Sequence, residues 1–222
     1  MQSEDFALLT HGKQESYCKM YNNYFYTRHN DFWYNNAMKK LQQLIASTNM
    51  LTCGEDLGML NESVSRCMNN LKILSLELQI MPKQYGVDLG NPQTYPYLSV
   101  CTTSTHDCQT LRMWLGERNS TKAASENAHT VDAPAAECAK VLAENLASPS
   151  MLAIFPLQDW MSIDGKLRKK DPASERINIP AVADHYWRYR MHLTIEELLK
   201  ATSFNNKVKE LASRQTGVSE PV

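Results

Sequence analysis

Four short runs of apolar residues alternate with segments of helical periodicity, and this alternation constrains the fold more than any other feature of the chain. The runs lie within residues Met50–Cys53, Leu71–Leu78, Tyr97–Cys101 and Met151–Pro156. Strands buried on both faces of a parallel sheet are continuously apolar, and the last run has this character. Strands that alternate with helices favour a parallel sheet with helices outside it. We therefore predict an α/β fold.

The segments around these runs predict helices. Apolar residues fall at helical spacing over residues 32–45, and a second helix follows Asn61, which is a suitable N-cap. Further helices are expected from about Asp107 and over residues 135–147. The last helix is expected to open on a capping box, because Thr194 is followed three residues later by a glutamate.

Two segments lack such patterns. Residues 1–30 are polar and rich in Tyr and Asn, so we expect an irregular lead-in. Residues 117–134 are small, polar and charged, which is typical of a mobile surface connection. Four strand–helix units cannot close an eight-stranded barrel, which takes about 250 residues. The pattern therefore predicts that residues 1–222 form about half of such a barrel.

Composition excludes several classes of function. A formal net charge of −1 gives no electrostatic basis for binding nucleic acid or an anionic membrane. No apolar run approaches the roughly 20 residues of a membrane helix, and the first residues do not resemble a secretory signal. The six cysteines are dispersed, as expected for free thiols in the cytoplasm. A zinc site of Cys101, His106 and Cys108 lacks the usual ligand spacing, so we expect no metal.

Carboxylates follow two of the apolar runs. Glu55 comes after the first run and Asp107, next to His106, comes after the third. Loops at the ends of parallel strands are where α/β barrels usually carry their chemistry. Glycoside chemistry needs two carboxyl groups beside the scissile bond, and partial burial of Glu55 would raise its pKa to suit an acid/base. Each pair of polar residues can equally be a solvated turn.

Other polar and aromatic groups fit the same chemistry. The fourth run ends on Gln158 and Asp159. The imidazole of His106 can donate a hydrogen bond to a sugar hydroxyl. The rings of Tyr186 and Trp187 can stack on sugar faces. Together these groups predict a carbohydrate-processing cleft.

Five segments, in order along the chain, resemble the 4-α-glucanotransferases, the amylomaltase or disproportionating-enzyme family. The similarity is closest to its long branch, which bears starch-binding domains, and it runs from about Tyr24 to the C-terminus. A sixth segment, His185–His192, is similar to that branch too. The five segments are Met50–Met59, Leu74–Gln79, Tyr97–Asp107, Ile154–Asp159 and Glu175–Pro180.

This resemblance implies a (β/α)8 TIM barrel, of which the chain would supply the C-terminal four βα units. It implies transfer of α-1,4-glucan segments among maltose, maltooligosaccharides or larger glucans by retaining double displacement, without a cofactor. Glu55 would be the acid/base and Asp107 the transition-state stabiliser. His106, Gln158 and Asn178 would contact substrate.

The resemblance also implies that the catalytic nucleophile is missing from this sequence. The family's nucleophile is an Asp in an Arg-x-Asp-His-type motif, and no such motif occurs here. We therefore expect that the N-terminal half of the barrel must complete the site, and that the chain alone does not turn over. The alternatives are an inactive or glucan-binding remnant, and hydrolysis in place of transfer. Ile80 stands where the family has an Arg, which affects the acceptor side of the cleft.

Overall fold

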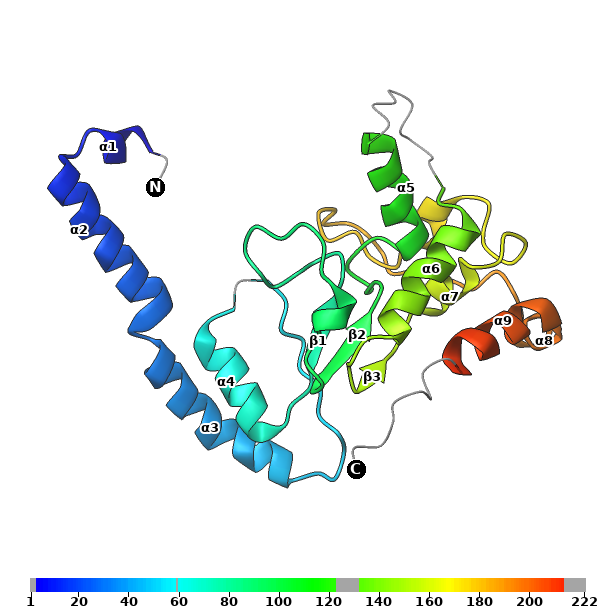
Figure 1. Ribbon diagram of the computed structural model, residues 1–222, viewed down its shortest axis with the longest axis horizontal. Coiled ribbons are helices and arrows are strands. Elements are labelled where there is room, and N and C mark those ends of the chain that lie inside the picture. The colour runs from blue at the N-terminus through cyan, green and yellow to red at the C-terminus, as the bar shows by residue number, and fades with distance from the viewer. Residues whose placement is uncertain (1–2, 59, 123–131, 214–222) are drawn as a thin grey trace. The chain divides into compact units, whose positions relative to one another are not determined.

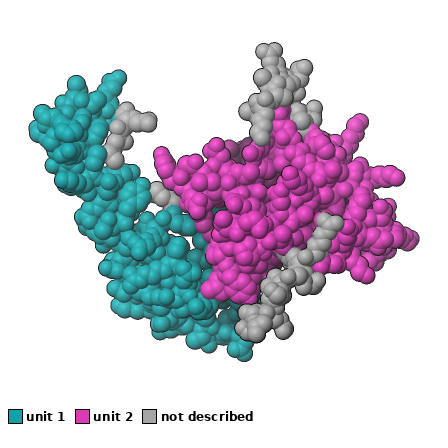
Figure 2. All heavy atoms as spheres, viewed as in Figure 1, with its two compact units in different colours: residues 1–75 teal, residues 76–222 magenta. Residues whose placement is uncertain are grey.

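The computed structural model describes residues 3–58, 60–122 and 132–213. Contacts within the chain divide it into two compact units, residues 1–75 and residues 76–222 (Figure 2). Each unit is described by itself.

The first unit begins with a series of helices. These are α1 (Glu4–Ala7), α2 (His11–Asn22), a π-helical turn (Asn23–Thr27) and α3 (Asn30–Ala46). The prediction of an irregular lead-in over residues 1–30 was therefore wrong for the part that the structure describes. Neither α2 nor α3 has a buried residue. Because α2 has no apolar stripe, hydrophobic periodicity could not reveal it.

Helix α3 confirms the helix expected over residues 32–45, and it packs against α4 (Glu62–Leu71). Asn61 is the N-cap residue of α4, as predicted, although its side chain makes no capping hydrogen bond. Arg66 of α4 pairs with Asp31 at 3.1 Å, and its guanidinium lies 3.9 Å from the ring centroid of Tyr34. The two helices are thus joined on their exposed side by polar and cation–π contacts.

The predicted strand Met50–Cys53 is much reduced. Cys53 forms a single parallel bridge with Leu74, flanked by two backbone hydrogen bonds, Gly54 N to Leu74 O and Leu74 N to Thr52 O. Met50 is 77% exposed. The prediction of a buried strand at this position was therefore wrong in its extent, although the direction of pairing is parallel.

The sheet contains β1 (Ser75–Leu78), β2 (Ser99–Thr102) and β3 (Leu152–Ala153) in that order (Figure 1). Strands β2 and β3 are parallel, with Val100 opposite Leu152 and Cys101 opposite Ala153. All four residues of β2 are buried. The structure thus confirms three of the predicted strands and the parallel α/β character, with strands shorter than the apolar runs.

The helices of the second unit are α5 (Leu111–Lys122), α6 (Ala135–Leu146), α7 (Leu157–Met161), α8 (Ile195–Lys200) and α9 (Thr202–Ser213), with 3-10 turns at Pro92–Thr94 and Pro172–Glu175. The mobile connection expected over residues 117–134 was wrong where it is described. Residues 117–122 belong to α5 and Ala133 is completely buried, while residues 123–131 lie outside the described ranges.

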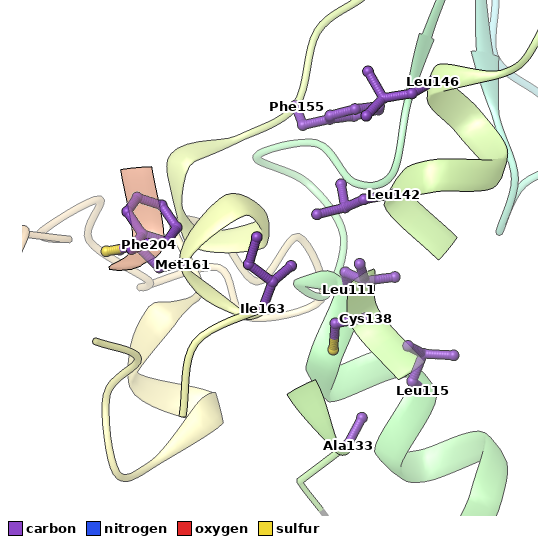
Figure 3. Close-up of a cluster of buried hydrophobic side chains, with 10 residues drawn as sticks. All are labelled: Leu111, Leu115, Ala133, Cys138, Leu142, Leu146, Phe155, Met161, Ile163 and Phe204. Carbon is purple, nitrogen blue, oxygen red and sulfur yellow. The ribbon is translucent and has the colours of Figure 1, made fainter. Parts of the chain in front are cut away.

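One hydrophobic core holds these helices together. Its side chains come from α5, α6, α7 and α9, from positions next to these helices, and from Phe155, just after β3 (Figure 3). Its buried members are Leu111, Leu115, Ala133, Cys138, Leu142, Leu146, Phe155, Met161, Ile163 and Phe204. Since α5 and α7 both follow strand ends, this core fixes the two elements beside which the candidate site is built.

All six cysteines are free. Burial raises the pKa of Cys138 to about 11, so this thiol stays protonated at neutral pH. Among the residues that the structure describes, no three His, Cys, Asp or Glu side chains are grouped so as to hold a metal ion. No described helix is both long and apolar enough to span a membrane.

Candidate active site

The second unit brings three of the five predicted site residues together. Nε2 of His106 lies 3.3 Å from Oδ2 of Asp107, and Nδ2 of Asn178 donates to Oδ1 of the same carboxylate at 2.6 Å. The Asp107 side chain is 47% exposed, so its oxygens can still reach a ligand. Asp107 and Asn178 are 71 positions apart in the chain and meet only through the fold.

The backbone around Asp107 is held from both sides. Within the turn, the Asp107 N–H donates to Oγ1 of Thr105, and the Thr105 N–H donates to Sγ of Cys108. From outside the turn, the Asn178 N–H donates to the His106 carbonyl at 3.1 Å. The carboxylate therefore projects from a fixed loop just beyond the end of β2.

An exposed indole lies beside this group. The ring of Trp187 is 5.1 Å from the His106 ring, tilted by 46°, and the Trp187 side chain is 59% exposed. The neighbouring segment is held in turn, because His185 Nε2 lies 3.0 Å from the Ile177 carbonyl oxygen. An exposed aromatic face next to a carboxylate, an imidazole and an amide is an arrangement that suits a sugar ring.

Gln158 does not join the group. It lies in the first turn of α7, where its side chain is only 5% exposed and makes no hydrogen bond within the described residues. Its proposed contact with substrate stays a prediction.

Asp159, the next residue, has a structural role that the sequence did not reveal. It is completely buried, and its Oδ2 accepts from the hydroxyls of Thr103 and Ser104 at 2.7 and 2.5 Å. Its Oδ1 accepts from the Leu111 N–H at 2.8 Å. Burial raises the pKa of Asp159, against the opposing effect of these three hydrogen bonds. Asp159 thus joins both ends of the loop that carries His106 and Asp107.

A second buried network lies behind the same loop. The Arg112 guanidinium is completely buried and donates to Glu175 at 2.7 Å, to Asp132 at 2.9 Å and to the Lys169 carbonyl at 2.7 Å. The Asp132 carboxylate also pairs with Arg168 at 3.3 Å. The sequence gives no signal for this network, because its members come from distant segments of the chain.

Glu55 lies in the first unit, so its geometry is described separately from that of Asp107. Its side chain is exposed, and the expected partial burial was therefore wrong, whereas the adjacent Asp56 is only 7% exposed. A Cβ atom at position 54 would lie 3.1 Å from Cε of Met68, so the Gly before Glu55 allows a close approach to α4.

The chain is thus a parallel α/β protein whose second unit groups a carboxylate, an imidazole, an amide and an exposed indole. The family model described as 4-alpha-glucanotransferase matches residues 8–194. The chain belongs to this family, which confirms the resemblance found in the sequence.

Individual proteins similar in sequence to this chain are also 4-alpha-glucanotransferases. The chain is 36% identical over 204 residues to 4-alpha-glucanotransferase DPE2 of Oryza sativa subsp. japonica, covering 88% of this chain and 21% of that protein. It is 27% identical over 180 residues to the 4-alpha-glucanotransferase of Chlamydia pneumoniae, covering 77% and 34% respectively. The chain thus spans between a fifth and about a third of the length of these relatives.

Solved structures show the same fold. The amylomaltase of Streptococcus agalactiae in complex with acarbose matches with a TM-score of 0.55 and 19% identity, over 84% of this chain and 34% of that one. The amylomaltase of Corynebacterium glutamicum matches with a TM-score of 0.51 and 15% identity, over 73% and 28%. The described units therefore have the fold of part of an amylomaltase.

Proposed function

We propose that this chain carries the acid/base and the transition-state stabiliser of a 4-alpha-glucanotransferase that acts on maltose, maltooligosaccharides or larger α-1,4-glucans. The observation that carries the proposal is the grouping of His106 and Asn178 at the half-exposed carboxylate of Asp107, with the indole of Trp187 beside His106. Family membership supplies the reaction class.

In the proposed reaction, Glu55 protonates the glycosidic oxygen while the bond from that oxygen to C1 breaks. A carboxylate nucleophile forms a covalent bond to C1 in the same step. The Glu55 carboxylate then takes the proton of an acceptor hydroxyl, which attacks C1 and displaces the nucleophile. Asp107 accepts hydrogen bonds from sugar hydroxyls and stabilises the positive charge that develops on the ring.

The nucleophile is proposed to come from outside this sequence. No Arg-x-Asp-His motif is present, and Asp31, which precedes Glu55, is paired with Arg66 on the exposed side of α3 and α4. We propose that the N-terminal half of a (β/α)8 barrel supplies the missing Asp, and that this chain provides the C-terminal four βα units. The free cysteines support the proposal of a cytoplasmic location.

Calorimetric titration with acarbose and maltoheptaose tests the binding part of the proposal. The substitution Trp187→Ala is expected to weaken binding about five- to tenfold, because it removes the stacking surface beside His106. Trp33→Ala is the matched control, since Trp33 is also an exposed indole beside a histidine, His29, but lies on α3. Equal affinity of the Trp187 variant and the wild type would contradict this site.

Product analysis separates transfer from the alternatives. With the barrel completed, transfer predicts longer maltooligosaccharides from maltotriose, whereas hydrolysis predicts only shorter products whether or not an acceptor sugar is added. Binding without any turnover would instead support a glucan-binding remnant.

A further inference from the structure

The position of Asn178 depends on more than its own contacts with the site. It lies in a segment without helix or strand, between the 3-10 turn Pro172–Glu175 and a turn at Pro180. Its two contacts with the loop are its N–H to the His106 carbonyl and its amide to Asp107. A segment of this kind needs an anchor nearby if a 2.6 Å side-chain contact is to persist.

Glu175, three residues before Asn178, is that anchor. Its side chain is completely buried, its Oε2 accepts from Nε of Arg112 at 2.7 Å, and its Oε1 accepts from the Lys169 N–H at 3.1 Å. Arg112 lies in the first turn of α5, five residues after Asp107. One buried ion pair therefore ties the segment that carries Asn178 to the helix that follows Asp107.

The ion pair between Arg112 and Glu175 is well suited to fix the position of the groups that it joins. The Nε, Nη1 and Nη2 atoms of Arg112 each have an acceptor, namely Glu175, Asp132 and the Lys169 carbonyl. A buried ion pair offers little net stability over apolar residues of the same size, because both charges must be desolvated. What a fork-shaped guanidinium provides is a fixed direction for each partner.

We propose that Glu175 is a positioning residue, which holds Asn178 against Asp107 through its ion pair with Arg112. The part that Asp107 and Asn178 play in glucan binding rests on the proposed function. The positioning itself concerns only this chain and can be measured without a ligand.

Two charge-neutralising variants on the same guanidinium make a matched pair. In Glu175→Gln, one amide oxygen must replace two acceptors that face separate donors, Arg112 Nε and the Lys169 N–H, so one contact is lost. In Asp132→Asn the amide oxygen can take the place of Oδ2, which faces both Arg112 and Arg168. The amide nitrogen then occupies the position of Oδ1, which has no hydrogen-bond partner among the residues that the structure describes.

The test compares the two variants in the full chain by NMR of the Asn178 side-chain amide, assigned through its loss in Asn178→Ala. We expect Glu175→Gln to move this resonance to the position of a solvent-exposed Asn amide and to weaken acarbose binding about tenfold. We expect Asp132→Asn to leave both unchanged. Should Glu175→Gln fail to fold, Arg112→Lys removes the same Nε donor and carries the same expectation.

A purely structural role would lower thermal stability in both variants and leave the Asn178 amide resonance in place below the unfolding transition. That result, or an equal shift of the resonance in Asp132→Asn, would overturn the proposal. If the wild type itself does not bind acarbose, the proposed function fails, whereas the amide resonance still decides whether Glu175 positions Asn178.

Discussion

Asp159, the buried carboxylate that holds the loop around Asp107, has a raised pKa, because burial disfavours its charged form. A raised folded-state pKa means that the folded protein holds its proton more tightly than the unfolded chain. The Asp159 contribution to stability is therefore fully present below the unfolded pKa of about 3.9 and declines as the pH rises through the folded pKa. Asp159→Asn removes this dependence.

We expect the unfolding free energy of the wild type minus that of Asp159→Asn to be larger near pH 4 than at pH 7. Urea titrations of both proteins across this range measure it. A difference that grows with pH would mean that the hydrogen bonds from Thr103, Ser104 and Leu111 outweigh burial and lower the pKa instead.

At the scale of residues, the sequence revealed the groups that follow strands but not those that support them. His106 and Asp107 were predictable because they lie directly after an apolar run, and the family resemblance added Asn178. Asp159 and Glu175 were not predictable as supports, since their partners Leu111 and Arg112 lie 48 and 63 positions away. Charge and spacing along the chain carry no information about such pairings.

At the scale of elements, the capping box of α8 is a local motif with a predictable effect. The Thr194 hydroxyl accepts from the Glu197 N–H, and the Glu197 carboxylate accepts from the Thr194 N–H, which lowers the pKa of Glu197. The contribution of Glu197 is therefore present above its unfolded pKa and lost as the pH falls through the lowered folded value.

We expect Thr194→Ala to reduce the unfolding free energy by about 1 kcal/mol, because α8 loses its N-cap. Faster hydrogen exchange of the first-turn amides of α8, measured by NMR, is the direct readout. Thr202→Ala provides a comparison at the start of the neighbouring helix α9, where the hydroxyl donates to the Lys200 carbonyl. Unchanged exchange in α8 of the Thr194 variant would contradict the role of the cap.

The same scale shows where periodicity succeeds and fails. The capping box and the helices over residues 32–45 and 135–147 were predicted because a cap or an apolar face marks them. Helix α2 was missed because it has no such face. The strands were predicted too long, since an apolar run continues past the residues that find a hydrogen-bonded neighbour, as Met50 and Leu51 show.

At the scale of the whole molecule, the stability of the second unit depends largely on the hydrophobic core that its helices share. Leu142 of α6 is completely buried in that core, whereas Leu199 of α8 is 73% exposed. We expect Leu142→Ala to cost about 3 kcal/mol through lost burial and a residual cavity, and Leu199→Ala less than about 0.5 kcal/mol. Chemical denaturation of the two variants measures the contrast, and equal losses would contradict the core assignment.

The central proposal is that Glu55 and Asp107 each serve the 4-alpha-glucanotransferase reaction, and that the nucleophile is supplied from outside this sequence. The most direct test mixes this chain with the part of the Oryza sativa relative that precedes the aligned region, and measures disproportionation of maltotriose. We predict no turnover by the chain alone and transfer by the mixture, which Glu55→Gln or Asp107→Asn lowers at least about 100-fold. Glu62→Gln, an exposed carboxylate in the first turn of α4, leaves it unchanged. Robust glucose release by the chain alone, or full transfer by the Glu55 variant, would contradict the claim.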